Sequence, residues 1–382
     1  MAVISFDVGG TYVKYGLIED SHIVQKGKFK TDKVDKDSFL SSLAAKIEEL
    51  SLLASIKGIG ISFPGFIDTV NGVPILAGAI TSINGVNIVN EVKRRLTMDC
   101  PIYIENDANC AAIAEKYNGA AIDNNDFILL TLGTGVGGAI YYQNQTIKGH
   151  SYRAGELGMM LTDYGKYPNK TLHELASTSA LISLYKEKYR LPPEAEITGE
   201  EIFSLTNDYK VEAIIREWSK YVAVAIFNSV VIFNPEKVLI GGGISQNPAL
   251  YPYINEALNS IPYWQDFIIP VEICKHYNDS GLWGAYILVE NHLKQGSVKE
   301  MKFLNGGWLV KDGFEVNYAT HVYSTRQSKN ILTLYAPFSY INHKGSTLDG
   351  GMMTIELFTP HPDIIGVRMY HYKGTKNLSR VL

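Results

Sequence analysis

The sequence is poor in the features that would indicate a disulfide framework, a membrane span or a nucleic-acid surface. It has three cysteines in 382 residues, and none of them forms a Cys-x-x-Cys pair, so neither a disulfide scaffold nor a cysteine zinc site is expected. The net charge is −4 and no basic stripe is visible, which argues against a nucleic-acid partner. No run of about 18 apolar residues occurs, so no membrane span is expected.

The sequence also lacks a signal peptide and one common phosphate-binding loop motif. The amino terminus lacks the basic region and the long apolar stretch of a signal peptide, so we expect a cytoplasmic protein. The phosphate loop Gly-x4-Gly-Lys-[Ser/Thr] is also missing. The composition, 46% hydrophobic and 19% charged, is that of ordinary globular material, and the length suffices for two or three domains.

Two segments repeat a pattern of strand, glycine turn and returning strand. The apolar run 2–8 ends in Asp7, turns at Gly9-Gly10-Thr11 and returns through residues 12–18. The apolar run 127–132 is followed by the turn 133–138, which holds four glycines, and by a returning strand at 139–142. This repeat predicts two related halves that arose by internal duplication.

The two glycine turns are candidates for binding a polyphosphate. Glycine lets the backbone approach a phosphate closely, and the turn amides and the Thr11 hydroxyl can donate to phosphate oxygens. Asp7 is placed to orient Mg²⁺ or its waters beside the phosphates. One such hairpin is usually only a turn, but two that each follow an apolar strand indicate a pair of loops on one polyphosphate. A third turn, at 241–243, is a candidate floor for adenosine, or else a tight strand–helix turn. The predicted ATP-binding residues are Asp7, Gly9, Gly10, Thr11, Lys14, Gly133, Thr134, Gly135, Gly137, Gly242 and Gly243.

Apolar periodicity predicts the remaining elements of this part of the chain. Helices are expected over residues 37–54, 86–96, 110–117, 209–232 and 280–293, and strands over 59–63, 102–104 and 237–240.

Six ordered motifs over residues 2–292 resemble those of the ROK family (repressors, open reading frames and sugar kinases) within the actin-like ATPase superfamily. This resemblance implies a ribonuclease H-like α/β fold whose two lobes close over ATP and a sugar. It places a small lobe with sugar and phosphate motifs at 1–117 and a large lobe with the nucleotide site at 118–293, and a homodimer is expected. The motifs are Asp7-Val8-Gly9-Gly10-Thr11-x2-Lys14, Ile61-Ser62-Phe63-Pro64-Gly65, Glu105-Asn106-Asp107-Ala108-Asn109, Leu132-Gly133-Thr134-Gly135-Val136-Gly137-Gly138, Ala154-Gly155-Glu156-Leu157-Gly158 and Ile240-Gly241-Gly242-Gly243.

The resemblance also assigns roles to individual residues. A sugar hydroxyl that attacks the γ-phosphate needs an acceptor for its proton, and Asp107 at the end of a strand suits that role. The resemblance implies Asp107 as the base; without the other motifs a helix-capping aspartate would be the better interpretation. The predicted sugar-binding residues are Gly65, Asn84, Asn106, Asp107, Glu156 and Glu174. For the two glutamates, the alternative interpretation is an ordinary surface position without a sugar contact.

The sequence departs from the family pattern after Glu156. Many relatives have a histidine where Met159 stands, followed by three cysteines that bind zinc, and residues 160–175 contain no cysteine, so no structural zinc is expected. The segment 78–87 also differs from its usual form. The sequence thus resembles the zinc-less subgroup that includes β-glucoside kinases.

The predicted reaction is the phosphorylation by ATP and Mg²⁺ of the 6-hydroxyl of a glucose-type sugar, with a β-glucoside disaccharide as the expected substrate. The alternatives are a glucokinase, another ROK hexokinase acting on fructose, allose or N-acetylmannosamine, and a non-catalytic sugar-responsive regulator. ROK repressors carry a helix-turn-helix domain before the first glycine hairpin, which starts here at residue 7, so no DNA-reading domain is expected.

The last part of the chain has a different character. Residues 294–300 are polar and are expected to form a linker. Residues 301–382 show short alternating segments that predict an all-β module, and they resemble the N-terminal β-domain of family 31 glycoside hydrolases of the α-xylosidase or α-glucosidase type. The catalytic barrel of that family would lie beyond Leu382, so no glycosidase activity is expected. The simplest interpretation is a kinase joined to the first part of a neighbouring glycosidase; an unrelated β-sandwich is the alternative.

Overall fold

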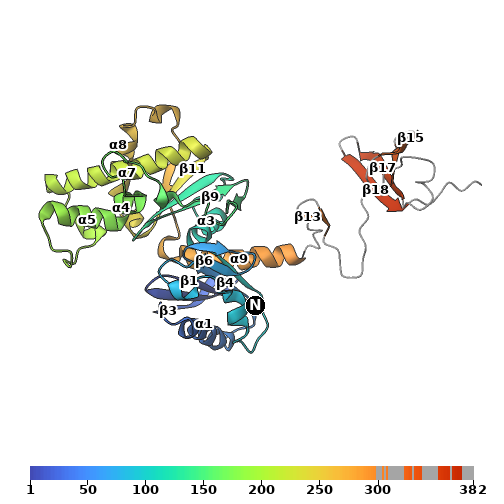
Figure 1. Cartoon of the computed structure of the whole chain (residues 1–382), viewed down its shortest axis with the longest axis horizontal. Coiled ribbons are helices and arrows are strands. Elements are labelled where there is room, and N and C mark those ends of the chain that lie inside the picture. The colour runs from blue at the N-terminus through green and yellow to red at the C-terminus, as the bar shows by residue number, and fades with distance from the viewer. Residues whose placement is uncertain are drawn as a thin grey trace, which may run out of the picture. The chain divides into compact units, whose positions relative to one another are not determined.

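The structure is a computed structural model that describes residues 1–297 and, further on, 303–304, 307–308, 322–328, 331–337, 352–361 and 364–371. The chain divides into two compact units, Met1–Val298 and Lys299–Leu382. Figure 1 shows both units, and each is described here by itself.

The first unit opens with a mixed sheet of the order β3-β2-β1-β4-β7. Strands β1, β2 and β3 form an antiparallel meander, and β4 and β7 are added parallel to β1. The strands span β1 (Ala2–Val8), β2 (Tyr12–Glu19), β3 (His22–Lys30), β4 (Ile56–Phe63) and β7 (Ile102–Asn106).

A second sheet, of the order β10-β9-β8-β11-β12, repeats this topology. Its first three strands form an antiparallel meander, and the last two are added parallel to β8. The agreement in order and direction is what the repeated strand–turn–strand pattern predicts. The strands span β8 (Phe127–Leu132), β9 (Val136–Tyr142), β10 (Gln145–Thr146), β11 (Lys237–Gly241) and β12 (Val271–Ile273).

Helix α1 (Lys36–Ser51) covers one face of the first sheet. The Asp35 side chain caps it by accepting from the backbone N–H groups of residues 37 and 38, as the exposed donors of a first turn require. Its apolar stripe, which includes Phe39 and Leu43, is buried in one cluster with the strands and with α2 (Ile88–Lys93).

The opposite face of the first sheet is covered by the last helix of the unit, α9 (Ser280–Ser297). Residues 286–289 form a cluster with Val3 and Ile18 of the first sheet and with Ile113 of α3 (Asp107–Asn118). A Cβ atom on Gly60 of β4 would lie 2.1 Å from the Ala285 carbonyl oxygen, so this glycine permits the close approach of α9. The lobe boundaries predicted at 1–117 and 118–293 stay a prediction; in the structure α9 packs on the sheet of the first lobe, and apolar periodicity cannot reveal which sheet a helix will join.

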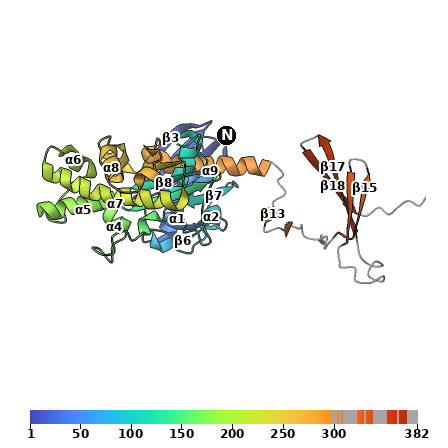
Figure 2. The same cartoon turned by 90° about the horizontal axis from the view of Figure 1, so that it is seen from above.

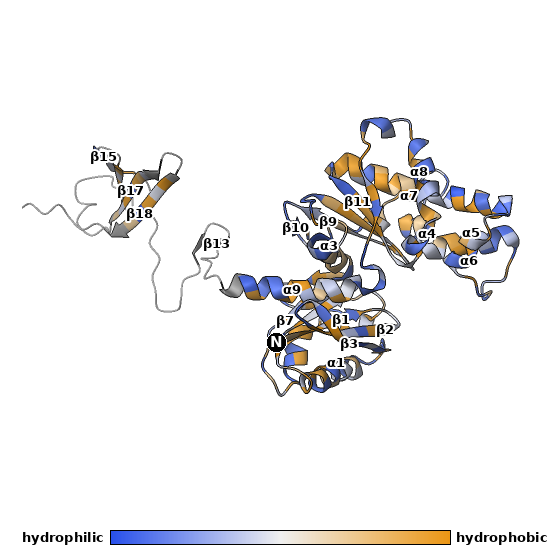
Figure 3. Ribbon diagram, turned by 180° about the vertical axis from the view of Figure 1, so that it is seen from behind, coloured by the Kyte–Doolittle hydropathy of each residue, from blue (hydrophilic) through white to orange (hydrophobic). Residues whose placement is uncertain are grey.

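The helices of the second lobe gather on one face of its sheet, at the end of this unit farthest from the C-terminal end of α9 (Figure 2). Helix α7 and strand β11 are predominantly hydrophobic (Figure 3), and the α7 residue Trp218 is buried and donates from Nε1 to the Ser177 carbonyl at 2.9 Å. The helices are α4 (Leu172–Ala176), α5 (Thr178–Tyr189), α6 (Gly199–Ser204), α7 (Tyr209–Phe233) and α8 (Leu250–Asn259).

Helix α3 joins the two lobes. Its alanines, among them Ala108 and Ala112, pack on the second sheet with Phe127 and Leu129, while Ile113 packs with α9. The amino terminus of α3 therefore lies where both lobes meet. The short elements of this unit are β5 (Phe66–Asp68), β6 (Val73–Leu76), η1 (Thr81–Ile83), η2 (Leu157–Met159), η3 (Gly243–Gln246), η4 (Trp264–Asp266) and η5 (Tyr277–Asp279).

The second unit contains a four-stranded antiparallel sheet of the order β15-β16-β17-β18. The predicted all-β character is confirmed for the described strands, whereas the resemblance to a glycoside hydrolase domain stays a prediction. Helix α9 extends to Ser297, into the segment predicted as a linker. The strands are β13 (Phe303–Leu304), β14 (Gly307–Trp308), β15 (Ser324–Ser328), β16 (Ile331–Pro337), β17 (Met352–His361) and β18 (Ile364–His371). Across the described residues, none of the helices combines the length and apolar content that a bilayer span requires.

Candidate functional site

A cavity of about 310 Å³ lies between the two lobes of the first unit. The first lobe contributes Gly65, Asn106 and Asp107 to its wall, and the second lobe contributes a long stretch of glycine-rich backbone. The second-lobe residues are Thr131, Gly133, Thr134, Gly135, Val136, Gly137, Gly138, Glu156, His173 and Gly242. Nine of the residues predicted from sequence are thus brought together: Gly65, Asn106, Asp107, Gly133, Thr134, Gly135, Gly137, Glu156 and Gly242.

Asn106 and Asp107 mark the point where β7 ends and α3 begins. Asn106 caps the helix, since its Oδ1 accepts from the backbone N–H of Asn109 at 3.0 Å. Its Nδ2 donates to the Gly65 carbonyl at 2.9 Å and to Asp107 Oδ1 at 3.0 Å. The capping function that sequence alone offers for an aspartate here is carried by the asparagine, which leaves Asp107 as the first helical residue.

The environment of Asp107 raises the pKa of its carboxyl to about 7. Desolvation by the surrounding protein is the largest cause, and the negative charges of Asp7 and Glu156 add to it, while the N–H of Ala108, which donates at 2.8 Å, acts in the opposite direction. The side chain is open to the cavity, so water reaches one side of a carboxyl that protein atoms enclose on the others. A carboxyl with this pKa can accept a proton near neutral pH.

The first glycine hairpin carries a charged cluster at its base. Asp7 Oδ2 lies 3.2 Å from Lys14 Nζ, and Asp7 Oδ1 accepts from Ser62 Oγ at 3.0 Å. Lys14 also donates to the Asn278 carbonyl at 2.7 Å. The turn itself is tight, because the Gly9 N–H donates to the Tyr12 carbonyl at 3.0 Å. A partly exposed carboxylate between a lysine and a hydroxyl is a suitable oxygen donor for Mg²⁺, directly or through water.

Asp7, Gly9, Gly10, Thr11 and Lys14 do not line the 310 Å³ cavity itself. Their link to it is electrostatic, since the charge of Asp7 contributes to the raised pKa of Asp107.

Gly133 of the second hairpin and Gly243, which follows β11, both have open space above the backbone. A Cβ atom on Gly133 would approach no protein atom closer than 4.0 Å, and one on Gly243 would meet none within 4 Å. Neither residue has a positive φ angle, so neither packing nor backbone conformation requires glycine there. Gly133 also lines the cavity, so at this position a bound group could approach the backbone closely. Gly137 differs, because its Cβ would lie 2.5 Å from Thr131 Oγ1.

Glu156 presents an acidic group from the second lobe. It precedes η2, is half-buried, and burial raises the pKa of its carboxyl. No protein group in the described part of the chain hydrogen-bonds this carboxylate, so its oxygens are able to accept hydrogen bonds from a molecule in the cavity. Gly65 faces it with a φ of +92°, and a Cβ there would lie 1.9 Å from the Leu76 carbonyl oxygen, so this turn accepts only glycine.

The structure does not bring Glu174 or Asn84 to this cavity. Glu174 is exposed and forms a capping box with Thr171 at the start of α4. Asn84 is exposed and its Oδ1 accepts from the Ala77 N–H at 2.8 Å. Both side chains have structural partners, and their predicted sugar contacts find no support in this geometry. Gly243 follows Gly242 but is likewise absent from the cavity wall.

His173 is a cavity residue that sequence reasoning missed. Its Nδ1 accepts from the Val136 N–H at 2.9 Å, which fixes the neutral tautomer with hydrogen on Nε2. A signal for this arrangement was present: Thr171-x-x-Glu174 is a capping-box pattern, which assigns Glu174 to the helix start and directs attention to the neighbouring histidine.

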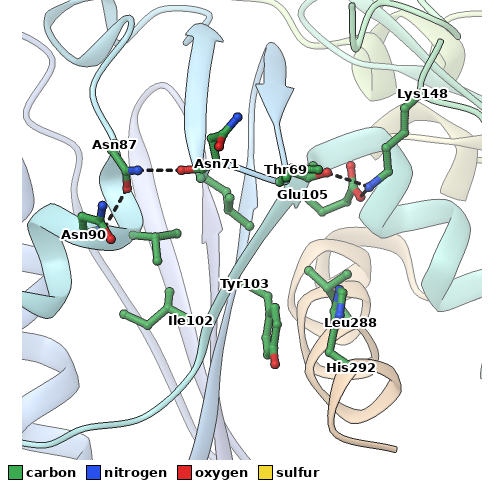
Figure 4. A pocket seen from close by; sticks show the side chains of 14 residues that line it. Thr69, Asn71, Asn87, Asn90, Ile102, Tyr103, Glu105, Lys148, Leu288 and His292 are labelled. Carbon is green, nitrogen blue, oxygen red and sulfur yellow. Dashed lines mark hydrogen bonds and ion pairs between the residues drawn. The ribbon is translucent and has the colours of Figure 1, made fainter. Parts of the chain in front are cut away.

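A larger cavity, of about 600 Å³, runs along β7 on the far side of Glu105 (Figure 4). Its wall includes Asn90, Tyr103, Lys148 and His292 and holds none of the predicted site residues. Size alone would favour it, but the second glycine hairpin and the carboxyl with the raised pKa meet in the smaller cavity, which we take as the candidate active site.

Comparisons with known proteins agree with this arrangement. Residues 3–292 match the ROK family. A β-glucoside kinase from Klebsiella pneumoniae is 32% identical over 75% of this chain and 95% of its own length. A β-glucoside kinase from Listeria monocytogenes is 33% identical over 75% of this chain and 96% of its own length.

Solved structures give the same result for the fold. A ROK hexokinase from Thermus thermophilus is similar with a TM-score of 0.66 and 27% identity, over 78% of this chain and all of that one. A ROK glucokinase from Streptomyces griseus, solved with glucose and AMPPNP, has a TM-score of 0.66 over 76% of this chain and all of that one; at 23% identity it supports the fold alone. The predicted actin-like ATPase fold is thereby confirmed, and the chain belongs to the ROK family.

Proposed function

We propose that this protein is an ATP-dependent sugar kinase that phosphorylates the 6-hydroxyl of a glucose-type ring and prefers a β-glucoside disaccharide to free glucose. The observation that carries the proposal is the placement of Asp107. Its carboxyl, with a pKa raised to about 7, opens into a cavity whose opposite wall is the glycine-rich hairpin of the second lobe.

In this proposal Asp107 accepts the proton of the attacking hydroxyl. Asn106, which is fixed between Gly65 and the first turn of α3, and Glu156 hold the hydroxyl groups of the ring. Phosphoryl transfer depends mainly on positioning and on charge stabilisation, so the orientation of the ring relative to Asp107 is the main contribution of these side chains.

The two hairpins would hold the nucleotide. The open position of Gly133 in the second hairpin would let a phosphate approach the hairpin backbone, and Gly242 and Gly243 would border the adenosine. Asp7 would hold Mg²⁺, with Lys14 and Ser62 fixing its orientation. When bound, Mg²⁺ neutralises phosphate charge.

The preference for a β-glucoside is supported by residues beside Glu156 and by the comparisons. Met159 stands where many relatives carry histidine, and its side chain is 56% exposed, which leaves room beside the ring for an attached group. The β-glucoside kinases of Klebsiella and Listeria are among the proteins that this chain resembles. We further propose a cytoplasmic homodimer that uses Mg²⁺ and has no structural zinc.

The test is a set of specificity constants. ADP release is measured with ATP and glucose, cellobiose, gentiobiose, maltose, fructose, N-acetylmannosamine and N-acetylglucosamine, and zinc is determined by elemental analysis. We expect kcat/KM to be highest for cellobiose or gentiobiose. A clearly higher value for glucose would replace the β-glucoside proposal with a glucokinase, and an absence of turnover with every sugar would contradict the kinase itself.

A further inference from the structure

An ion pair connects the two lobes directly behind the catalytic strand. Lys148 follows β10 in the second lobe, and its Nζ lies 2.7 Å from Glu105 Oε2 of β7 in the first lobe. The same ammonium group donates to Thr69 Oγ1 at 2.8 Å. Figure 4 shows Lys148 reaching from its own lobe to both partners.

Glu105 connects Lys148 to the residues on either side of Asp107. The side chain is 2% exposed, and its second oxygen, Oε1, accepts from the Asn106 backbone N–H at 3.0 Å and from Asn109 Nδ2 at 3.1 Å. One carboxylate therefore joins a lysine of the second lobe to the residue directly before Asp107 and to the first turn of α3.

The ion pair differs from the surface pairs of this chain in its burial. Lys188 and Glu217, for example, lie 3.7 Å apart with side chains 52% and 31% exposed, and such pairs contribute little. A buried carboxylate that loses its partner is left as an uncompensated charge or takes up a proton. In either case the charged acceptor that holds Asn106 and Asn109 is weakened.

Further contacts tie the same second-lobe segment to the first lobe. Arg153 lies over the Phe66 ring with its Cζ 5.2 Å from the centroid. Tyr152 has a φ of 58°, an uncommon conformation for a residue other than glycine, and a hydrogen bond between Tyr152 and Asp68 contributes to the raised pKa of its phenol. Glu156 stands at the end of this segment, so whatever fixes residues 148–153 against the first lobe also fixes the separation of Glu156 and Asp107.

We infer that Lys148 is a positioning residue of the phosphoryl-transfer reaction, which acts through Glu105 to hold the Asn106–Asp107 junction at a fixed place relative to Glu156. Lys148 lines a narrow crevice beside Asn106 and Glu156 and does not line the candidate active site. Its effect is therefore on geometry and not on direct contact with substrate. The inference rests on the proposed function, in which Asp107 takes the proton.

The experiment compares Lys148→Met, Lys148→Arg, the double variant Lys148→Met/Glu105→Gln and the control Lys188→Met. Small misplacements of reacting groups lower rates strongly, so we expect Lys148→Met to lower kcat at least about tenfold with KM for ATP within twofold. Lys148→Arg should keep most of kcat. The double variant should have a higher kcat than Lys148→Met, because it leaves no buried charge unpaired. The control Lys188→Met should have the kcat of the parent.

A kcat of Lys148→Met within twofold of the parent would overturn the inference, as would an equal loss in the arginine variant or a rise in KM for ATP that accounts for the whole effect. Thermal unfolding of the same set together with the single variant Glu105→Gln gives the coupling between residues 105 and 148 as a double-mutant cycle. If Lys148→Met fails to fold, the arginine and double variants decide. If the parent phosphorylates no sugar, the proposed function fails, while an absence of coupling in unfolding refutes the ion pair separately.

Discussion

The two halves of the kinase unit share one sheet topology and differ at the ends of matching strands. In the first half, Asp7 of β1 is paired across the sheet with Lys14 and Ser62. At the matching place of the second half, Thr131 of β8 is paired with Gly137 and Gly241. One hairpin base thus carries charges and the other only a hydroxyl and glycines.

The last strands of the two sheets show the same contrast. Strand β7 leads into Asn106 and Asp107 and then into α3. Strand β12 leads into Cys274, which is buried and has a thiol pKa well above its usual range because of desolvation. Under the proposed function, the comparison indicates how a duplicated fold would divide a reaction: the first half would supply the proton acceptor and the metal-binding carboxylate, and the second would supply close backbone approach to phosphate together with Glu156.

The largest expected effect is at Asp107. We predict that Asp107→Asn lowers kcat at least about 100-fold, the usual contribution of a positioned general base, because the amide cannot accept the hydroxyl proton. Binding of ATP, measured by calorimetry, should stay within a few-fold of the parent. Activity close to that of the parent would remove Asp107 from the mechanism.

The raised pKa of Asp107 also predicts the pH dependence. Because the pKa is about 7 in the free protein, the carboxyl is increasingly protonated below pH 7, and kcat/KM for the sugar should fall there by about tenfold per pH unit. The folded state favours the protonated form, so the unfolding free energy should decrease as pH rises from about 4 to 7, and Asp107→Asn should unfold at a slightly higher temperature than the parent at pH 8. A rate profile that is flat down to pH 5 would contradict this assignment.

The second hairpin can be compared with a neutral glycine elsewhere. A Cβ atom added at Gly133 or at Gly165 would approach no protein atom closer than 4.0 Å, but only Gly133 lines the cavity. We predict that Gly133→Ala raises KM for ATP about tenfold, because the added methyl group would hold a phosphate away from the hairpin backbone and weaken about one hydrogen bond to a charged group. The matched variant Gly165→Ala should leave KM unchanged. Equal values for both variants would mean that the second hairpin does not hold phosphate.

Glu156 and Glu174 can be compared in variants whose expected effects are smaller and differ from each other. Glu156→Gln should raise KM for the sugar several-fold, because the carboxylate lines the cavity and has no hydrogen-bond partner among the residues that the structure describes. Glu174→Gln should leave kcat/KM unchanged and lower the unfolding free energy by about 1 kcal/mol or less through the weakened capping box. Bonds from Thr171 lower the pKa of Glu174, so this contribution should be lost as the solution is acidified below the ordinary carboxyl range. A rise in sugar KM in the second variant would restore Glu174 to the site.

The smallest expected effect on activity is that of removing the second unit. A chain that ends at Val298, where the two units divide, should fold and keep nearly all of its kcat/KM. The described residues that line the candidate active site all belong to the first unit. A loss of most of the activity would show that the tail belongs to the enzyme.

Local patterns predicted the fold well, because glycine turns after apolar strands and helical periodicity are signals contained in a few neighbouring residues. The positions of Asp107, Asn106 and the glycines of the second hairpin follow from such motifs. The return of α9 to the first lobe could not be predicted in this way, because its close approach depends on Gly60, more than 200 residues earlier in the chain. Similarly, the Lys148–Glu105 pair spans 43 residues and has no sequence pattern of its own.

The account is tested most directly by the identity of the product. The protein is incubated with ATP, Mg²⁺ and cellobiose, ADP is quantified, and the phosphorylated oxygen is located by phosphorus–proton NMR. The account predicts one ADP for each disaccharide phosphate, with phosphate on the 6-oxygen of the non-reducing glucosyl ring and no ADP release when sugar is omitted. ADP release that does not depend on sugar, or phosphate on another oxygen, would contradict it.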